Sequence, residues 1–339
     1  MAYITFDDDD VIEGNIVRGV TSTAFSNNTG SISTFFTSST ATSSDAGKYF
    51  IDLFNLNPSS DINAESQFAI AFGHSKGSGS VIQTGATVGN SPTKAVYSQF
   101  RQLLLNDTSE KTLFSFGDNT TSERMYFLSV NRARYKQGVN AGNWELHLSS
   151  SALGGPAGVN RFASGLAGDG SPLELIDDSS VSNGETVNGH LVYNIVSGSE
   201  TDGPYKDASS NHHYWGLFYP EMGIFAFNGD RVLSGSGAVD SSTYGLYLGT
   251  GSYGIGTGSN VNNNVNEALF YAINRGGKFE MRAEEDVTST HYFVRAKNNQ
   301  FNYSTNPTYQ TGSNGQLRHQ SFIQNPQTFI TTVGLYNDD

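Results

Sequence analysis

The stretch MYFLSVNRARYKQGVNAGNWELHLSS, residues 125–150, decides the fold of this chain. Two apolar patterns flank a short basic insert. In the second pattern Trp144, Leu146 and Leu148 alternate with polar neighbours, which is the period of a strand that buries one face. The first pattern also reads as a strand, so the stretch predicts two strands joined by a charged connection.

Similar patterns recur along the chain between tracts rich in Gly, Ser, Thr and Asn. KYFIDLFNLNP at residues 48–58 carries bulk at successive positions and predicts a mostly buried strand. Aromatic strands are expected at residues 190–198, 213–229 and 242–249, and further strands near 278–286, 289–304 and 327–339. Within the second of these, YPEMG at residues 219–223 resembles a tight hairpin turn.

Two segments show helical spacing. SPTKAVYSQFRQLLL predicts a helix near residues 92–105, with Ser91 as the N-cap and Pro92 at the first helical position. The second helix is expected near residues 263–275, where Leu269 and Ile273 share a face and Gly276 provides the stop.

Together these patterns predict an α+β chain that is mainly β, with antiparallel, sandwich-like sheets, about two helices and long Gly/Ser/Asn-rich loops. We expect a polar N-terminal arm over residues 1–45 and a β-rich part with one helix over 46–150. Gly-rich loops or a linker over 151–189 precede a second β-rich part with one helix over 190–339. Alternatively, residues 46–339 form a single domain. No repeat of fixed period is visible, which argues against a propeller, a solenoid or a fibre shaft.

Composition narrows the protein class. Only 15% of the residues are charged and Gly numbers 38, which suits short strands joined by polar loops. The formal net charge of −13 disfavours nucleic-acid binding, since an acidic surface repels phosphate. The absence of Cys excludes disulfides, zinc–thiolate sites and Cys nucleophiles.

We expect neither export through a signal peptide nor a membrane span. MAYITFDDDDVIEGN at residues 1–15 has no basic region followed by a long apolar core. No segment approaches the roughly 20 consecutive apolar residues of a membrane-spanning helix.

Several motifs suggest chemistry but have simpler explanations. GTGSYG at residues 249–254 fits a dinucleotide fingerprint, yet the next predicted helix begins too far along the chain, so a loop is favoured. His212 and His213 are neighbours that point to opposite faces of a strand, which does not suit a metal. An acidic run without the oxygen spacing of a calcium loop favours a solvated tip or a contact with a basic partner; it comprises Asp7, Asp8, Asp9 and Asp10.

No catalytic set stands out. The paired acids Glu284 and Glu285 lie beside basic and acidic neighbours near a strand end. Paired carboxylates of glycosidases usually meet in space from distant positions, so spacing alone does not decide that case. We therefore expect no enzymatic activity and no cofactor.

The basic insert is the remaining candidate. Arg132, Arg134 and Lys136 lie within five residues, and Arg132 and Arg134 share a face if the strand continues. The guanidinium group matches a carboxylate through two parallel hydrogen bonds, so an acidic partner subunit, including an arm like the acidic run, is a sensible target. The alternative is a hairpin loop of solvated charges.

Four segments carry a resemblance to a known group. SPTKAVYSQFRQLLL, LSVNRARYKQGVNAGNWELHL, THYFVRAKNNQFNYSTNP and QTFITTVGLYND resemble virion structural proteins of contractile-tailed, T4-like phages of cyanobacteria, over about residues 48–339. The most specific parts are NRARYKQ with GNWEL and the carboxy-terminal FITTVGLYND. The resemblance brings no catalytic residues with it.

The resemblance implies a subunit made in the host cytoplasm and incorporated into the virion tail, with other virion proteins and copies of itself as partners. The resemblance leads us to expect that related chains continue past GLYND with a further strand, whereas this sequence ends at Asp339. We therefore expect either a shorter version or a terminal strand completed by a neighbour.

Two other functions remain as alternatives. A receptor-binding or carbohydrate-contacting tail module would use exposed aromatic residues such as Tyr214, Trp215 and Tyr219 to stack on a host surface glycan, although packing of these residues in the strand core is favoured. A glycan-degrading tail enzyme ranks behind it, because no motif supports one.

Overall fold

The computed structural model describes residues 7–37, 50–77, 91–149, 172–206, 210–233, 265–297, 300, 307–327, 332 and 334. Contacts within the chain divide it into two compact units. The larger unit is residues 19–285, and the smaller unit is residues 1–18 together with 286–339. Strands β1 (Val11–Thr23) and β15 (Phe279–Val294) each contribute residues to both units.

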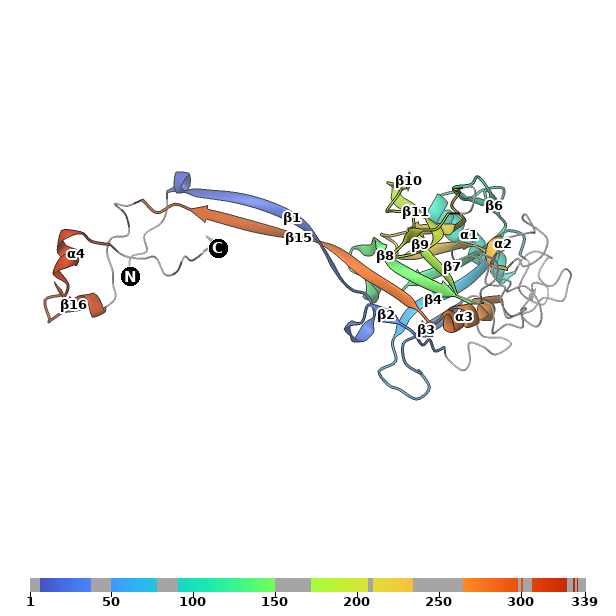
Figure 1. Cartoon of the computed structure of the whole chain (residues 1–339), viewed down its shortest axis with the longest axis horizontal. Helices are drawn as coiled ribbons and strands as arrows, with labels where there is room; N and C mark the ends of the chain where they lie inside the picture. The colour runs from blue at the N-terminus through green and yellow to red at the C-terminus, as the bar shows by residue number, and fades with distance from the viewer. Residues whose placement is uncertain are drawn as a thin grey trace. The chain divides into compact units, whose positions relative to one another are not determined.

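The larger unit is built on one mainly antiparallel sheet (Figure 1). Its strands follow the order β15-β8-β9-β11-β13-β14-β7-β4-β3. Their bounds are β3 (Ile51–Phe54), β4 (Ser66–His74), β7 (Arg124–Val130), β8 (Gly138–Leu148), β9 (Leu173–Asp177), β11 (His190–Ser199), β13 (Tyr214–Tyr219) and β14 (Ile224–Asn228). Short strands extend it: β2 (Ser31–Ile32) pairs with β15, and β10 (Glu185–Val187) and β12 (Gly203–Pro204) pair with β11. A separate pair is formed by β5 (Phe114–Ser115) and β6 (Thr121–Ser122).

The described residues confirm the predicted fold class, α+β and mainly β. Alternation along the central strands explains why both faces of the sheet are buried. In β7, Tyr126 and Leu128 enter one apolar cluster, whereas Met125 and Phe127 enter the other. Successive side chains of a strand point to opposite faces, so a strand that is apolar at every position requires cover on both sides.

The sheet of the larger unit curls strongly around the first of these clusters. Phe279 of β15 packs edge-on against Phe68 of β4 with ring centroids 5.2 Å apart, although six strands lie between them in the sheet order. Phe279 also contacts Phe225 of β14, and Trp144 of β8 contacts the same ring. Aromatic side chains from distant strands therefore fill one shared interior.

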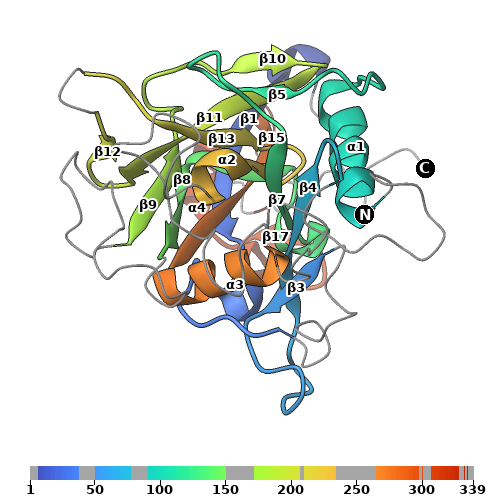
Figure 2. The same ribbon diagram turned by 90° about the vertical axis from the view of Figure 1, so that its right-hand side faces the viewer.

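Helices cover different parts of this sheet (Figure 2). Helix α1 (Pro92–Leu105) packs on β4 through Val96, Tyr97 and Leu104, and α3 (Val265–Gly276) places Leu269 and Ile273 in the interior cluster. Both confirm the predicted helices. A short helix, α2 (Gly229–Leu233), follows β14.

The N-cap predicted for α1 differs in the structure. Ser91 occupies the N-cap position, but its hydroxyl donates to the carbonyl of Gly77 at 2.6 Å instead of capping the helix. The Ser91 side chain therefore bonds to a distant carbonyl, and not to a backbone N–H of the first helical turn. At the other end, Asn106 adopts a left-handed conformation with φ of 50° and terminates the helix.

The predicted turn at YPEMG joins β13 to β14, with Tyr219 paired to Ile224. Gly223 has a φ of 61°, which an L-residue with a side chain rarely adopts. This turn also contacts the connection that follows β7, because the hydroxyl of Tyr135 donates to the carbonyl of Met222 at 2.7 Å.

The division into units differs from the one that composition suggested. Residues 24–36, placed in a polar arm, bury Ala24, Phe25, Ile32 and Phe35 in the interior of the larger unit. Four apolar residues suffice to anchor a hydroxyl-rich segment when they reach a common core. Most of the expected linker, residues 150–171, lies outside the described residues, as does most of the expected last strand.

The smaller unit contains paired segments of β1 and β15, a short hairpin of β16 (Gln310–Thr311) and β17 (Gln316–Leu317), and the helix α4 (Gln320–Gln324). No helix in the described parts of the chain has the length and apolar character needed to cross a membrane.

Candidate functional site

The basic insert forms a short 3-10 turn, Arg132–Arg134, between β7 and β8. Asn131 shapes the turn, because its side-chain oxygen accepts from the backbone nitrogen of Ala133 at 3.1 Å. Arg132 then folds back: its Nη1 donates to the carbonyl of Tyr135 at 2.6 Å, and its guanidinium lies 4.7 Å from the centre of that ring. The insert therefore does not continue the strand, so Arg132 and Arg134 are not placed on one strand face.

The other two cations of the insert contact acids of the same unit. Arg134 forms an ion pair with Glu65 at 3.0 Å, and Lys136 forms one with Glu285. The side chain of Glu65 is more than half exposed, and that of Glu285 is about one-quarter exposed. Pairs at such a surface are worth about 0–1 kcal/mol each, so they orient the insert more than they stabilise it.

A pocket of about 310 Å³ lies beside the insert, within the larger unit. Arg134, Tyr135 and Lys136 line one side, and residues 22–28 line the other. Asn27 and Asn28 both have positive φ, 62° and 56°, which shapes the second wall. Nε of Arg134 is buried and has no hydrogen-bond partner among the described residues. The pocket therefore offers a cation, amides and hydroxyls to a small polar group.

The acidic run lies in the smaller unit and contacts other cations than those of the insert. Asp10 is buried, and its Oδ1 accepts from Nε and Nη2 of Arg295 at 2.9 and 2.6 Å. Lys297 lies 2.7 Å from Oδ2 of Asp10 and 3.0 Å from Asp7. Hydrogen bonds from Lys297 and then Arg295 hold the pKa of Asp10 below its usual value.

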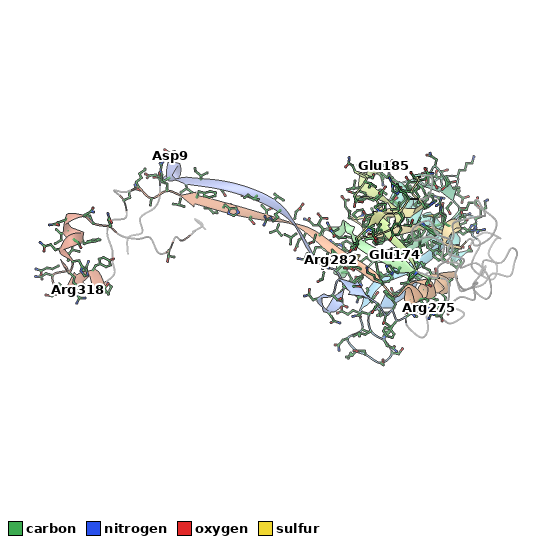
Figure 3. The ribbon with its side chains drawn as sticks, in the orientation of Figure 1. Asp9, Glu174, Glu185, Arg275, Arg282 and Arg318 are labelled. Atoms are coloured by element: carbon green, nitrogen blue, oxygen red, sulfur yellow. The ribbon has the colours of Figure 1, made fainter. Side chains whose placement is uncertain are left out.

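Asp8 and Asp9 are the remaining members of the run. Asp9 is exposed (Figure 3), and the side chain of Asp8 lies outside the described residues. In the described ranges no cluster of His, Asp or Glu is arranged to hold a metal ion. Asp7 and Asp10 instead join the start of β1 to the residues that follow β15.

The segments of β1 and β15 in the smaller unit form a two-stranded ribbon, defined as residues 11–18 and 287–294. Three contacts set its antiparallel register. The backbone nitrogen of Arg295 donates to the carbonyl of Asp10 at 2.8 Å, and the hydroxyl of Thr290 donates to Asn15 at 2.9 Å. Tyr292 forms a side-chain hydrogen bond with Glu13, which also raises the pKa of the Tyr292 phenol.

Large apolar side chains of this ribbon are exposed, and Figure 3 shows side chains projecting from both strands. Their exposed fractions are 67% for Ile12, 55% for Ile16, 63% for Val17, 41% for Val287, 45% for Tyr292, 65% for Phe293 and 36% for Val294. Isolated two-stranded ribbons are marginally stable in water, and contiguous exposed apolar surface marks interaction sites. The ribbon is thus a candidate assembly surface.

Sequence reasoning missed the ribbon for a clear reason. Residues 11–20, VIEGNIVRGV, alternate only loosely and fall within a segment dominated by Ser, Thr and Asn. The predicted strand near residues 289–304 did overlap β15, which ends at Val294. The signal that would have identified β1 is the presence of β-branched Ile and Val at both odd and even positions, which suits an edge strand exposed on two faces.

A buried charge network on the sheet of the larger unit was also missed. Glu145 of β8 is 6% exposed at its side chain and accepts from Lys278 at 2.8 Å and from the backbone nitrogen of Glu200 at 2.8 Å. His147 lies 2.6 Å away. Burial raises the pKa of Glu145, but hydrogen bonds from His147, Lys278 and Glu200 outweigh it and lower the pKa to about 2.

Neighbours of this network extend the polar face. Tyr205 donates to Glu174 at 2.9 Å, and Glu280 lies 3.5 Å from Lys278 and 3.6 Å from Arg282; Figure 3 labels Glu174 and Arg282. Because the carboxylate of Glu145 is held by three donors, it is suited to fixing the strands and poorly suited to proton transfer.

The other sequence candidates have local structural explanations or lie elsewhere. Residues 249–254, the glycine motif, lie outside the described residues. His212 contacts the carbonyl of Tyr205 at 3.2 Å. Trp215 and Tyr219 are fully buried, which confirms the favoured interpretation that they pack in the core and leaves neither ring available to a sugar.

Comparison with protein-family models finds no family that matches this chain, and comparisons with curated proteins and with solved structures find no match either.

Proposed function

We propose that this chain is a non-enzymatic structural subunit of a phage virion, of the contractile tail or its baseplate, that acts by assembling with copies of itself and with other virion proteins. The observation that carries the proposal is the ribbon. It exposes large apolar side chains on both strands while the larger unit completes its own core. A surface of this kind is stabilised when another chain covers it.

The segment-level resemblance to cyanophage virion proteins supplies the setting for this assembly. Its most specific block, NRARYKQ with GNWEL, falls on the basic insert and on β8. The described charged groups also favour a structural role, because the cations of the insert and the carboxylate of Glu145 are engaged within the chain.

A second candidate function, contact with a glycan, is favoured by the pocket beside the insert. Its hydroxyls and amides suit the hydroxyl groups of a sugar. The aromatic residues first considered for this role do not support it, since Trp215 and Tyr219 lie in the core.

The test of the structural proposal uses virions and purified chain together. An antibody against the larger unit, with gold label, is expected to mark the tail of intact particles in electron micrographs. The purified full chain is expected to self-associate in analytical ultracentrifugation. Unlabelled virions together with a chain that stays monomeric at all concentrations would overturn the proposal.

A further inference from the structure

We infer that one face of the ribbon is built to pack against the same face of a second copy of this chain, with the two ribbons running in opposite directions. The inference rests on the proposed multi-copy assembly and names the partner of that surface. The proposed contact involves only residues of the smaller unit.

The two faces of the ribbon differ in chemistry. Asn15 contacts Thr290, and Glu13 contacts Tyr292, so these residues share a face that we call the polar face. Alternation adds Val11, Val17, Thr288 and Val294 to the polar face. It assigns the remaining residues to what we call the apolar face, namely Ile12, Gly14, Ile16 and Arg18 of β1 with Val287, Ser289, His291 and Phe293 of β15.

Burial costs less on the apolar face. The polar face contains the carboxylate of Glu13, whose charge would be desolvated by a covering chain. The one charged side chain of the apolar face is Arg18, at the end of the ribbon, where its guanidinium can stay in water while its stem packs. The largest side chains of this face, Ile12 and Phe293, are about two-thirds exposed. With Ile16 and Val287 they leave on the order of 400 Å² of apolar surface in water, the size at which a patch marks an interaction site.

Charge favours a second copy as the occupant. The whole chain has a formal net charge of −13, so copies repel one another over most of their surface. The ribbon is formally neutral, because Glu13 balances Arg18 among residues 11–18 and 287–294. Copies can therefore approach at the ribbon without the repulsion that operates elsewhere.

The pattern of large and small residues favours the same occupant. With the two-fold axis placed at residues 15 and 290, Gly14 of one copy lies opposite Ile16 of the other, and Ser289 lies opposite His291. A Cβ added at Gly14 would meet no atom within 4 Å, so the space is open to a neighbour's side chain. The arrangement also keeps the two Arg18 side chains at opposite ends. Such self-complementarity is what a two-fold interface requires.

The size of the face sets the expected strength. About 400 Å² of apolar surface per copy is below the roughly 800 Å² per partner of a standard stable interface. Self-association through the ribbon alone should therefore be weak, and further copies in an assembly would strengthen it through effective concentration. Measurements of self-association must therefore extend to protein concentrations above the micromolar range.

Cross-linking of the full chain tests the geometry directly, because the chain has no Cys and therefore no background. The variant Ser289→Cys/His291→Cys places thiols on the apolar face, and Thr288→Cys/Thr290→Cys places them on the polar face as a matched control. Under mild oxidation the first is expected to give a covalent dimer and the second monomer. Positions two apart on one strand are roughly 6.6 Å apart at Cα, near the limit for an intrachain disulfide.

A second pair of variants measures the energetics. Ile16→Asp should weaken self-association by about tenfold or more, since an unpaired carboxylate resists burial, whereas Val17→Asp should change it by less than about twofold. Val17 is the more exposed of the two, so general exposure does not explain such a difference.

The outcomes separate this inference from the proposed function. A chain that self-associates while both cysteine pairs behave alike, or while Ile16→Asp and Val17→Asp weaken it equally, overturns the apolar-face contact and leaves multi-copy assembly standing. A chain that stays monomeric, while its virions are labelled by the antibody, overturns the second copy as occupant and retains a virion role.

Discussion

Gly73 of β4 marks the closest approach between the sheet and α1, and its replacement by Ala is the sharpest test of the fold. A Cβ at this position would lie 2.8 Å from the backbone nitrogen of Tyr97, 2.9 Å from its Cα and 3.0 Å from its Cβ. These atoms belong to the helix backbone or its immediate branch, so a rotamer change cannot relieve the contact. Helix α1 must move by roughly 0.5 Å to restore ordinary contact distances.

That movement disturbs a buried side chain with two hydrogen bonds. The hydroxyl of Tyr97 donates to the carbonyl of Ser122 at 2.9 Å and accepts from the nitrogen of Phe114 at 3.3 Å. Overpacking costs about 1–3 kcal/mol, and weakening these bonds adds up to about 1 kcal/mol. The smaller unfolded-state entropy of Ala returns about 0.4–1 kcal/mol. Gly73→Ala should therefore lower the unfolding free energy by about 2 kcal/mol.

Thermal unfolding followed by circular dichroism at low concentration measures the effect. A loss of about 2 kcal/mol corresponds to a fall in Tm of about 4–8 °C for a unit of this size. Gly14→Ala is the control, since its Cβ meets no atom within 4 Å. If Gly73→Ala unfolds within 1 °C of the unsubstituted chain, the close approach of α1 to β4 is refuted.

The other predictions concern charges. Because folding lowers the pKa of Glu145 from its ordinary value of 4.5 to about 2, its stabilisation is present above pH 4.5 and is lost as pH falls toward 2. Glu145→Gln should lower the unfolding free energy by about 2 kcal/mol at pH 7, after allowance for solvent screening, and by less at pH 3.5. Urea denaturation at the two pH values measures both differences, and equal losses would contradict the lowered pKa of Glu145. Charge reversal by Arg132→Glu with Arg134→Glu should cost about 1 kcal/mol through repulsion from Glu65 and impair incorporation into particles. Adding Glu65→Arg to this variant should restore its stability but not its incorporation into particles. Normal incorporation of the Arg132→Glu/Arg134→Glu chain would show that the insert is only a solvated loop.

Several elements could be predicted because their determinants are local. Helices α1 and α3 follow from apolar spacing, and the β13–β14 hairpin follows from the turn that ends at Gly223. The fold class follows from period-two patterns separated by turn formers. The curl of the sheet could not be predicted, because it depends on contacts such as Phe279 with Phe68, which lie far apart in the sequence.

The candidate site shows the same division. The sequence placed three cations in one insert, but the structure alone decides that Arg134 contacts Glu65, that Lys136 contacts Glu285 and that Arg132 contacts Tyr135. A cation's partner depends on which acid the fold brings within a few ångströms, and composition carries no information about that distance. The sequence prediction that the insert meets an acidic neighbouring subunit stays a prediction.

What the sequence by itself determined is where strands and helices form and which of their residues are apolar, because backbone periodicity is a local property. Whether an apolar residue is covered was decided only by the tertiary structure. The pattern allowed Trp215 and Tyr219 either to contact a ligand or to pack in the core, and the structure buries them, whereas it leaves Ile12 and Phe293 exposed. The physical reason is that exposure depends on which other strands lie against a face, and the pattern of one strand is the same whether or not a neighbour covers it.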